Sequence, residues 1–591
     1  MSNSLFRRKN ISSILAEGSD ESHGGSGLKR VLTAKDLTFF GIAAILGAGS
    51  FSSLGYAVFN GGPGVVVLFV ITAVACGFTA LCYSEFASRI PVAGSAYTYA
   101  YASFGEVFAW IIGWALIMEY SIGNIYVAYS WSDYFTSFLD KLGQLTNFNL
   151  HIPEYFCTSY MEAKNAVAGG EPTVAEAAAW NNAPTVGGLR MIIDIPALVI
   201  NVMITYLVYR GIKESRNFSN VMVILKLAVV FLIILVGGYF VFANGLSFNW
   251  TPADDQGVQS FMPNGFGGVM LAVSSVFFAY IGFDAVSVLA EESKNPQKDL
   301  PRGMLWSLII CTVIYILLTL VLTGAVNYRK FDGVGDPLAF IFEPQNLNVG
   351  WMQFLVAIVA VVAMTSVLLV FQMGQPRMWM SMSRDGLMPP VFQKIHPKFK
   401  TPSFATIVTG FVVGVPIIFT DKTFVLDFTS IATLFAFVLV CGGVLLIPRK
   451  EKVPGRFHLP YINGQFIFPL VVLASIVTAS VLSKTYFADI FNFDFSSNEE
   501  YVAGKKSFMD LATPNISLII FWLLAIIIAI LAFIKKYSLI PLMGVFTCMY
   551  LLTGMSKSNW VWFIGWLLLG IIFYFMYGYR KSKLAPTDPV L

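Results

Sequence analysis

The sequence predicts an all-α integral membrane protein, and three observations support this fold class. The chain has 591 residues, of which 56% are hydrophobic and only 12% are charged, whereas a soluble globular protein is about 25% charged. Its mean hydropathy is +0.70. Apolar runs recur along the whole chain and reach the ~20 residues that a helix needs to cross a bilayer. We therefore expect one bundle of membrane helices rather than a series of soluble domains.

Fourteen apolar segments are long enough to span the lipid bilayer, which predicts 14 transmembrane helices in total. In chain order they occupy residues 37–60, 64–89, 104–135, 190–210, 218–243, 266–290, 303–326, 350–380, 402–420, 424–447, 466–485, 515–534, 537–555 and 559–579.

Lysine and arginine gather in the N-terminal tail and in every second gap between these segments. Lys213 and Arg216 follow the fourth segment, for example, and Arg449 and Lys450 follow the tenth. Because basic residues accumulate on the cytoplasmic side of membrane proteins, both termini are placed in the cytoplasm. The alternation also supports the number of segments, since one missed span would invert half of the pattern.

The remaining gaps then face the outside, and the largest of them is 141–189. It contains acidic residues and few basic ones, and its alanine-rich middle predicts a short helix. The N-terminal tail has no uninterrupted apolar core, so no cleavable secretory signal is expected. The six cysteines show no spacing typical of a disulfide framework or a zinc site. We therefore expect no metal and no cofactor.

The first apolar segment contains the stretch GIAAILGAGSFSSLG, residues 41–55, with glycines at four positions. Glycine costs roughly 1 kcal/mol relative to alanine inside a helix. One interpretation is that small residues let two helices pack closely. The other is a discontinuous helix whose unpaired backbone groups bind a polar solute in the middle of the membrane.

The sixth apolar segment favours the second interpretation. It reads SSVFFAYIGFDAVSVLAEESKNPQKDLP over residues 274–301 and has an interruption at Gly282. The first and sixth segments occupy matching places in two successive blocks of five. Paired interrupted spans in the two halves of a chain are typical of the binding site of a secondary transporter.

Several stretches resemble the amino acid–polyamine–organocation superfamily, and within it the cationic amino acid transporter branch. They are GLKRVLTAKDLTFFGIAAILGAGSF (27–51), LCYSEFASRIPVAGSAYTYAY (81–101), GWALIMEY (113–120), YRGIKESRNFSNVMVILK (209–226), FFAYIGFDAVSVLAEESKNPQKDLPRG (277–303), GQPRMWMSMSRDGLMP (374–389) and WVWFIGWLLLGIIFYFMYGYRKS (560–582). The order of these matches along the chain makes the resemblance specific. Two additional spans before the final pair are similar to the 14-span amino acid permeases of this branch.

The resemblance implies a leucine-transporter-like fold, in which two five-helix repeats are inverted relative to each other and the first and sixth spans are broken. It divides the chain into a cytoplasmic tail (1–36), a first repeat (37–243), a second repeat (266–447), four peripheral spans (466–579) and a C-terminal tail (580–591).

The resemblance also implies how the two breaks bind an amino acid. A half-helix N-terminus favours an anion, and exposed carbonyl groups favour a cation. The substrate carboxylate is expected at the backbone N–H groups around Gly47, Ala48 and Gly49. Its ammonium group is expected at the carbonyls of Ile45, Phe278 and Ile281, and Ala279 completes the predicted set.

Two residues depart from the pattern GIGAIIGxGIF that the family shows at the first break. Ala43 stands where the family has glycine, and Ser50 stands where it has an aliphatic residue. The Gly-Ala-Gly core is intact, so the binding prediction stays.

Lys226 lies deep in the fifth apolar segment, within VMVILKLAVVFLIILV. A charge at this depth is costly and indicates function by default, although a lysine tied structurally to carbonyl groups is the alternative. The resemblance implies that its ammonium replaces a bound sodium ion and bridges the first and eighth segments near Gly47 and Thr365 or Ser366. Because burial disfavours a charged lysine, Lys226 is the candidate for proton coupling.

Two further residues near the expected site have competing interpretations. Glu119, in the third segment, would neutralise a substrate ammonium or form a structural pair with polar groups of neighbouring spans. Phe283, next to the sixth-segment break, would act as a gate or simply pack in the core, since 15% of the chain is aromatic.

A group of charged residues lies toward the expected cytoplasmic ends of the segments. It contains Glu85, Asp284, Glu291, Glu292, Arg377, Arg384 and Asp385. These residues would form an inner salt-bridge gate, or the arginines would only set the topology.

Together these features predict a secondary active transporter of L-amino acids in the cytoplasmic membrane, coupled to protons by symport and working by alternating access. An exchanger or uniporter of the same fold is the nearest alternative, and a non-transporting amino acid sensor is a further one. No nucleophile, metal-protease or phosphate-loop motif predicts an enzyme or an ATP-driven pump. The substrate is neutral or cationic, and Val370 and Phe371 would crowd a long side chain, which favours a neutral one.

Overall fold

The computed structural model describes residues 7–9, 32–47, 49–90, 95–169, 173–211, 216–253, 257–399, 401–446, 456–496, 501 and 506–584. Over this part of the chain the protein is helical, apart from one short antiparallel hairpin between β1 (Thr185–Val186) and β2 (Leu189–Arg190). Nine of the described helical stretches are long and apolar enough to cross a membrane. The all-α class is therefore confirmed, and the chain is a multi-pass membrane protein.

Each of the fourteen apolar segments contains at least one helix. The longer ones are α4 (Val65–Arg89), α6 (Glu106–Thr146), α9 (Ile195–Arg210), α10 (Arg216–Ala243), α13 (Pro296–Ala325), α15 (Gly350–Arg384), α16 (Ser403–Ile417), α17 (Lys422–Leu446), α18 (Gly464–Leu482), α21 (Phe508–Lys535), α22 (Leu539–Leu552) and α23 (Lys557–Phe573). Three of these, α9, α16 and α22, have 16, 15 and 14 residues and are shorter than a typical span, whereas α23 continues through a π-helix (Tyr574–Gly578) to Lys581.

The first apolar segment is interrupted near its middle. Helix α2 (Ala34–Ile45) begins at a capping box in which Thr33 and Asp36 satisfy each other's backbone N–H groups. It ends before Gly47, and a π-helix (Gly49–Ser53) and then α3 (Leu54–Gly61) continue the chain. The glycine-rich stretch therefore does break the helix.

The sixth apolar segment is interrupted as well. It consists of α11 (Gly265–Leu271), α12 (Val273–Phe278), a series of turns and a 3-10 helix (Asp284–Glu292). Gly282 lies in the turns with a φ of +115°. A side chain rarely adopts this conformation, so glycine is required where the backbone changes direction.

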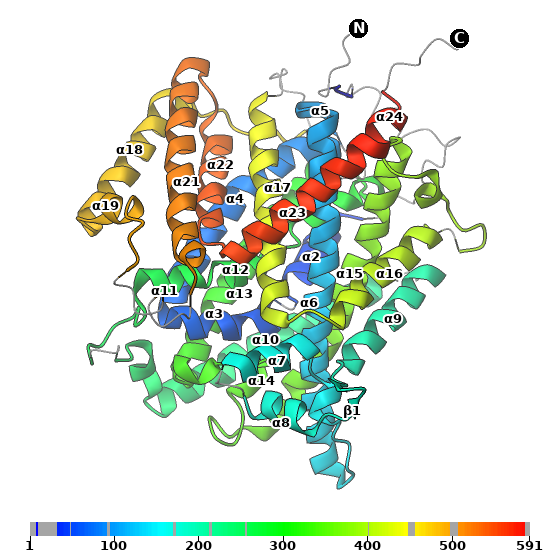
Figure 1. Cartoon of the computed structure of the whole chain (residues 1–591), viewed down its shortest axis with the longest axis vertical. Helices are drawn as coiled ribbons and strands as arrows, with labels where there is room; N and C mark the ends of the chain where they lie inside the picture. The colour runs from blue at the N-terminus through cyan, green and yellow to red at the C-terminus, as the bar shows by residue number, and fades with distance from the viewer. Residues whose placement is uncertain are drawn as a thin grey trace.

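Helix α6 runs through the centre of the molecule and packs along α15 and α17 (Figure 1). Helix α13 packs against both α2 and α4. The two interrupted segments lie between these groups, because α2 contacts α13 and α12 contacts α17. The breaks are therefore enclosed by helices rather than exposed to lipid, as irregular backbone at this depth requires.

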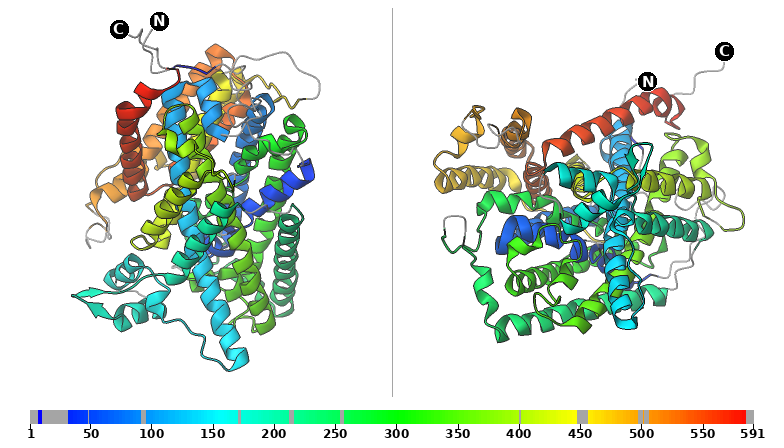
Figure 2. Two further views of the ribbon diagram at one scale, coloured as in Figure 1. Left: turned by 90° about the vertical axis from the view of Figure 1, so that its right-hand side faces the viewer. Right: turned by 60° about the horizontal axis from the view of Figure 1, so that its bottom comes forward.

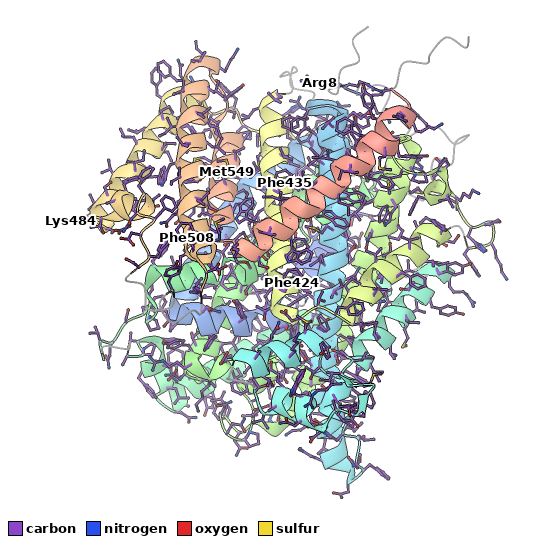
Figure 3. All side chains as sticks on the ribbon, viewed as in Figure 1. Arg8, Phe424, Phe435, Lys484, Phe508 and Met549 are labelled. Atoms are coloured by element: carbon purple, nitrogen blue, oxygen red, sulfur yellow. The ribbon has the colours of Figure 1, made fainter. Side chains whose placement is uncertain are left out.

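Helix α23 crosses α17 obliquely on one face (Figure 1). Phe435 of α17 contacts Phe563 of α23 with ring centroids 5.2 Å apart, and Phe424 contacts Trp562 at 5.9 Å; both α17 residues are labelled in Figure 3. On the other side α18 and α21 pack together at the edge, and α22 joins them to α4 and α17 (Figure 2).

The two ends of the molecule differ in what they carry. Helix α5 (Ser95–Ser103) and α24 (Tyr579–Lys581) lie at one end, whereas α7 (Tyr160–Gly169), α8 (Val174–Asn182) and β1 lie at the other (Figure 1). The segment 141–189 thus forms two short helices and a hairpin on the side opposite to residues 7–9 and the C-terminal helix.

Candidate functional site

The two interrupted segments meet directly. A Cβ atom at Gly49 would lie 2.5 Å from the Cα atom of Ala279, and one at Gly282 would lie 2.9 Å from the Cβ atom of Ala44. Such distances are too short for any side chain, so glycine at these two positions lets the backbones of the two breaks touch. Backbone groups from both segments are thereby collected in one place.

Tyr315 of α13 holds the two breaks together. Its hydroxyl oxygen lies 2.8 Å from the carbonyl oxygen of Ile45 and 2.7 Å from that of Ala279. A hydroxyl has one hydrogen and can donate it to only one carbonyl at a time. The second carbonyl therefore keeps acceptor capacity, which suits a group with several donors such as an ammonium.

The other predicted backbone groups bond to one another in this conformation. The N–H of Gly47 donates to the carbonyl of Ile45 at 2.9 Å, and the N–H of Ile281 donates to the carbonyl of Phe278 at 3.2 Å. These short turns close the two breaks. A ligand that uses the same groups has to replace these hydrogen bonds, and Ala48 lies outside the described residues.

Lys226 of α10 is buried, with 1% of its surface exposed. Its Nζ donates to the hydroxyl of Ser366 at 2.6 Å and to the carbonyl of Ala43 at 3.3 Å. The lysine thus connects α10 to the first segment and to α15. Thr365, the other residue considered for this role, instead accepts a hydrogen bond from the Trp131 indole at 2.9 Å.

Glu119 of α6 is buried close to another acid. It interacts electrostatically with Asp284, which follows the break in the sixth segment, and the Thr433 side chain lies within hydrogen-bonding reach. Its Oε2 atom has no hydrogen-bond partner among the described residues. Glu119 thus has an unpaired carboxylate oxygen and a second acid beside it. This buried acidic pair is suited to bind a cation or a proton.

Phe283 is fully buried in an aromatic cluster between three helical segments. Its ring lies 5.1 Å from that of Phe437 and 6.1 Å from that of Tyr83. On the other side of the break, Tyr126 lies edge-on against Phe278 with centroids 4.7 Å apart. Aromatic rings therefore close the space on both sides of the breaks.

Two of the charged residues considered for an inner gate, Asp385 and Glu85, have side-chain partners among the described residues. Asp385 accepts from Lys9 at 2.7 Å and from the Tyr97 hydroxyl at 2.6 Å. Glu85 pairs with Arg89 one turn later at 2.5 Å. These contacts join the two acids to Lys9, Tyr97 and Arg89, and the gate through Arg377 and Arg384 stays a prediction. The side chains of Glu291 and Glu292 lie outside the described residues.

The wall beside the first break is apolar. A Cβ at Gly47 would lie 2.3 Å from the Val367 side chain, and a Cβ at Gly123 would lie 3.3 Å from Phe371. The Phe371 ring also contacts Tyr120, with centroids 5.8 Å apart.

Sequence reasoning missed two polar residues in this region. Tyr315 is one of many aromatic residues in apolar segments, and nothing in the surrounding sequence indicates that its hydroxyl reaches both breaks. Asn124 of α6 is fully buried, and neither amide atom has a partner among the described residues. An amide in an apolar segment is costly without a partner. An asparagine at this position of the third apolar segment could therefore have been predicted as a functional residue from the sequence.

Comparison with known proteins assigns the chain to a family. Residues 32–499, well over half of the chain, match the amino acid permease family. The chain belongs to this family. The broken first and sixth segments described above lie within the matched region, which agrees with the resemblance noted from the sequence.

Individual relatives are named for different substrates. The chain is 41% identical to the branched-chain amino acid permease BcaP of Bacillus subtilis (strain 168), over 78% of this chain and 89% of the relative. It is 37% identical to a methylthioribose transporter of the same organism, over 81% and 91%. It is 30% identical to the vacuolar cationic amino acid transporter 2 of Arabidopsis thaliana, over 98% and 93%.

These relatives are all named as transporters or permeases, so the chain is a membrane transporter and not an enzyme. The family supports an amino acid as the substrate.

Proposed function

We propose that the protein is a secondary active transporter of L-amino acids that works by proton-coupled symport and alternating access. The proposal includes a leucine-transporter-like arrangement of two inverted five-helix repeats and four peripheral spans, 14 in total. The observation that carries it is the direct contact of two helix breaks, Gly49 against Ala279, next to a buried lysine.

The breaks suit the polar head of an amino acid. Backbone N–H groups around Gly47, Ala48 and Gly49 would receive the carboxylate, and the carbonyls of Ile45, Phe278, Ala279 and Ile281 would receive the ammonium. Tyr315 already spans the carbonyls of Ile45 and Ala279. Its hydroxyl would move aside when a three-donor ammonium arrives, so binding would repack the contact between the two segments.

Lys226 is the proposed site of proton coupling. It joins α10 to Ala43 and Ser366, that is, to the break and to α15. Its ammonium donates to both partners, whereas a neutral amine donates more weakly and can turn away. Loss of the proton would therefore loosen the tie between these elements, which is what a coupled conformational change requires.

The proposed location is the cytoplasmic membrane, with both termini in the cytoplasm. The positive-inside pattern supports this orientation. Helices α5 and α24 would then face the cytoplasm, and α7 and α8 would face the outside, at the opposite end of the molecule (Figure 1).

The proposed substrate is a neutral L-amino acid with an apolar side chain. Val367 lies against Gly47 at the first break, and a relative with 41% identity is named for branched-chain amino acids. Glu119 lies beside a second acid, Asp284, and one carboxylate near a ligand that already carries an α-ammonium does not make a pocket for a cationic side chain.

Uptake into proteoliposomes tests the proposal. Labelled leucine, alanine and arginine are supplied outside, with and without an acidic exterior. We expect leucine to accumulate only under the proton gradient, with unlabelled valine and isoleucine as competitors. Accumulation of arginine instead would overturn the neutral assignment. Flux that ignores the gradient but requires internal amino acid would identify an exchanger.

A second candidate substrate follows from the 37% identity to a methylthioribose transporter. Methylthioribose has neither a carboxylate nor an ammonium, so it would leave the backbone groups of the two breaks without charged partners. We expect it not to compete with leucine. Competition by methylthioribose at concentrations similar to those of valine would favour this second substrate.

A further inference from the structure

A large cavity lies at the end of the molecule that carries α7 and α8. Its volume is about 660 Å³, and it is lined by the first segment beyond the break, by α6, by α7 and α8, by the turn at 331–335 and by the start of α17. Ser52 and Tyr126 form part of its lining nearest the breaks. We call this cavity the vestibule.

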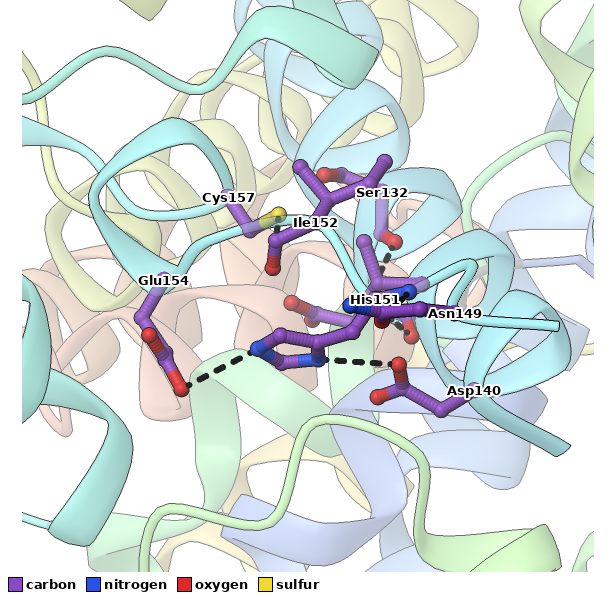
Figure 4. Close-up of polar contacts among 9 residues, drawn as sticks. Ser132, Asp140, Asn149, His151, Ile152, Glu154 and Cys157 are labelled. Atoms are coloured by element: carbon purple, nitrogen blue, oxygen red, sulfur yellow. Dashed lines mark hydrogen bonds and ion pairs between the residues drawn. The ribbon is translucent and has the colours of Figure 1, made fainter. Parts of the chain in front are cut away.

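The segment 147–157 covers one side of the vestibule. His151 lies between two acids, with its Nδ1 3.0 Å from Asp140 and its Nε2 3.4 Å from Glu154 (Figure 4). Cys157 and Thr158 continue the lining toward α7. The covering segment is thus fastened to the end of α6 by polar contacts.

The vestibule is mostly acidic, and one lysine stands among the acids. Lys422, at the start of α17, forms an ion pair with Asp133 of α6. Glu162 of α7 and Asp421 also face this region. Burial, together with the negative charges of Asp133, Glu176 and Asp421, raises the pKa of Glu162 to about 8. The Lys422–Asp133 pair is therefore the contact of opposite charges that ties α17 to α6 in the vestibule.

This ion pair lies next to the aromatic residue that covers the breaks. The Lys422 ammonium is 5.8 Å from the centre of the Tyr126 ring, close enough for a cation–π interaction. The Tyr126 hydroxyl donates to Ser52 at 3.2 Å, and its ring lies edge-on against Phe278. Contacts thus run without interruption from Lys422 through Tyr126 to both interrupted segments.

The position of Asp133 is fixed from a second side. A Cβ at Gly335 would lie 2.6 Å from the Oδ2 atom of Asp133, so the turn at 331–335 packs directly on the carboxylate. Ser52 itself is 3% exposed. Ser52 is therefore barely accessible where it lines the floor of the vestibule, because the Tyr126 hydroxyl bonds to it and Lys422 lies next to Tyr126.

We propose that Lys422 and Asp133 are positioning residues that hold Tyr126 over the breaks and so close the transport route on the vestibule side. The pair has to separate before Tyr126 can uncover Ser52, at the floor of the vestibule, and let a substrate pass on to Phe278. This inference rests on the proposed transport function for its meaning, but the closure itself is a property of the protein without substrate.

Cysteine labelling tests the closure without any transport measurement. Ser52→Cys reports on the route below the ion pair, and Ala166→Cys on α7 reports on the vestibule above it. Both are made in a Cys157→Ser background, because the other five cysteines are buried. A membrane-impermeant methanethiosulfonate reagent is added to intact cells, and the labelling rate is measured.

We expect Lys422→Met and Asp133→Asn each to raise the labelling rate of Ser52→Cys at least fivefold and to leave that of Ala166→Cys within twofold. The double variant Lys422→Met/Asp133→Asn should be no faster than either single variant, because both act through one contact. Unchanged labelling of Ser52→Cys would overturn the proposal. An equal increase at Ala166→Cys would also overturn it, since it would mean that the vestibule wall has loosened.

The reversed pair separates a specific closure from general damage. Lys422→Asp/Asp133→Lys restores opposite charges at the same two positions, so we expect slow labelling of Ser52→Cys to return. Fast labelling in this variant would contradict the proposal. If leucine uptake fails in the unsubstituted protein while the labelling pattern holds, the proposed substrate is wrong and the closure stands.

Discussion

At the scale of single residues, Lys226 is the most informative side chain. Burying an ammonium in the membrane core is costly, and here the cost is offset by hydrogen bonds to Ser366 and to the carbonyl of Ala43. A purely structural tie would not need a titratable group, because a hydroxyl or an amide could make the same bonds. We therefore propose that its proton is used, rather than that the lysine is only a structural tie.

Replacing Lys226 by alanine should remove proton coupling. We expect accumulation of leucine under an acidic exterior to fall at least tenfold, while exchange of leucine against internal leucine continues, because the backbone groups of the breaks are untouched. Initial uptake rates between pH 5.5 and pH 8 provide the measurement, and they should lose their pH dependence.

The matched control for this experiment is Ser366→Ala, which removes one partner of Lys226 and keeps its charge. It should weaken uptake but preserve the pH dependence. Proton-driven accumulation at the normal level in Lys226→Ala would mean that Lys226 is a structural lysine and that another group couples the proton.

The sequence revealed some of these residues and concealed others for a physical reason. Lys226 stands out because a charge is rare among apolar residues. Tyr315 does not stand out, because a tyrosine in an apolar segment is common and its importance depends on where its hydroxyl points. Only the packing of α13 against α2 brings that hydroxyl to the carbonyls of Ile45 and Ala279.

At the scale of elements, the contact between the two breaks depends on the absence of a side chain at Gly49. A Cβ there would meet the backbone of Ala279 at 2.5 Å, and backbone cannot rotate away as a side chain can. We expect Gly49→Ala to push the segments apart, to lower leucine uptake at least tenfold and to lower the midpoint of thermal unfolding by several degrees.

Gly77→Ala is the matched control, because a Cβ at Gly77 in α4 would have nothing within 4 Å. Alanine stabilises a helix by up to about 1 kcal/mol relative to glycine, so this variant should keep full uptake and an equal or higher unfolding midpoint. Normal uptake by Gly49→Ala would show that the close contact of the breaks is not required.

The segment 147–157 should respond to pH through His151. The hydrogen bond from His151 to Asp140 raises the pKa of the imidazole above its usual value near 6.5, and burial opposes this only in part. A raised pKa means that the folded segment favours the protonated form. Its stabilisation is therefore fully present below pH ~6.5 and is lost as the pH rises through the folded-state pKa.

Hydrogen exchange of the backbone amides in 147–157 checks this expectation. After correction for the intrinsic exchange rate, protection should be higher at pH 5.5 than at pH 8, and the difference should disappear in His151→Gln. Equal protection at both pH values in the unsubstituted protein would contradict the role of His151. The effect should be small, because half of the His151 side chain is exposed and solvent screens the pair.

Apolar patterning predicts the end of a helix only where the helix ends together with its apolar segment. Helix α6 continues to Thr146, beyond the apolar segment that ends at 135, because the backbone hydrogen bonds of a helix also form in a polar stretch. Helix α13 begins at Pro296, before the apolar segment starts, since proline is well tolerated in the first turn. Periodicity and hydropathy do not report such extensions.

At the scale of the whole molecule, the order of segments and the two breaks could be anticipated, whereas contacts between distant charges could not. The sequence grouped Asp385 with Arg377, Arg384 and several acids as an inner gate, which stays a prediction. The structure shows Asp385 bound to Lys9, which is distant in the chain, and to Tyr97. Charge type limits which pairs are possible, but the folded path of the chain decides which of them form.

Both ends of the described chain dock at the same place, beside α5. Glu106, at the start of α6, is fully buried and accepts from the Tyr574 hydroxyl at 2.8 Å and the Ser582 hydroxyl at 2.5 Å. The backbone N–H of Lys583 donates to the carbonyl of Asp385 at 3.1 Å. Residues from near both termini thus fasten the first turn of α6 to the end of α15.

Breaking this fastening should open the molecule on the side opposite to the vestibule. In Asp385→Asn, Lys9 loses its ionic partner and the Tyr97 hydroxyl faces a neutral amide. We expect at least threefold faster hydrogen exchange in α5 and in the first turn of α6, and lower accumulation of leucine because substrate leaks back.

The control is Asp510→Asn, which breaks the comparable Lys557–Asp510 pair between peripheral helices (3.2 Å) and should leave both measurements unchanged. If α5 exchanges at the original rate in Asp385→Asn, the chain ends do not hold this side closed, and the aromatic cluster of Tyr83, Phe283 and Phe437 becomes the better candidate for that role.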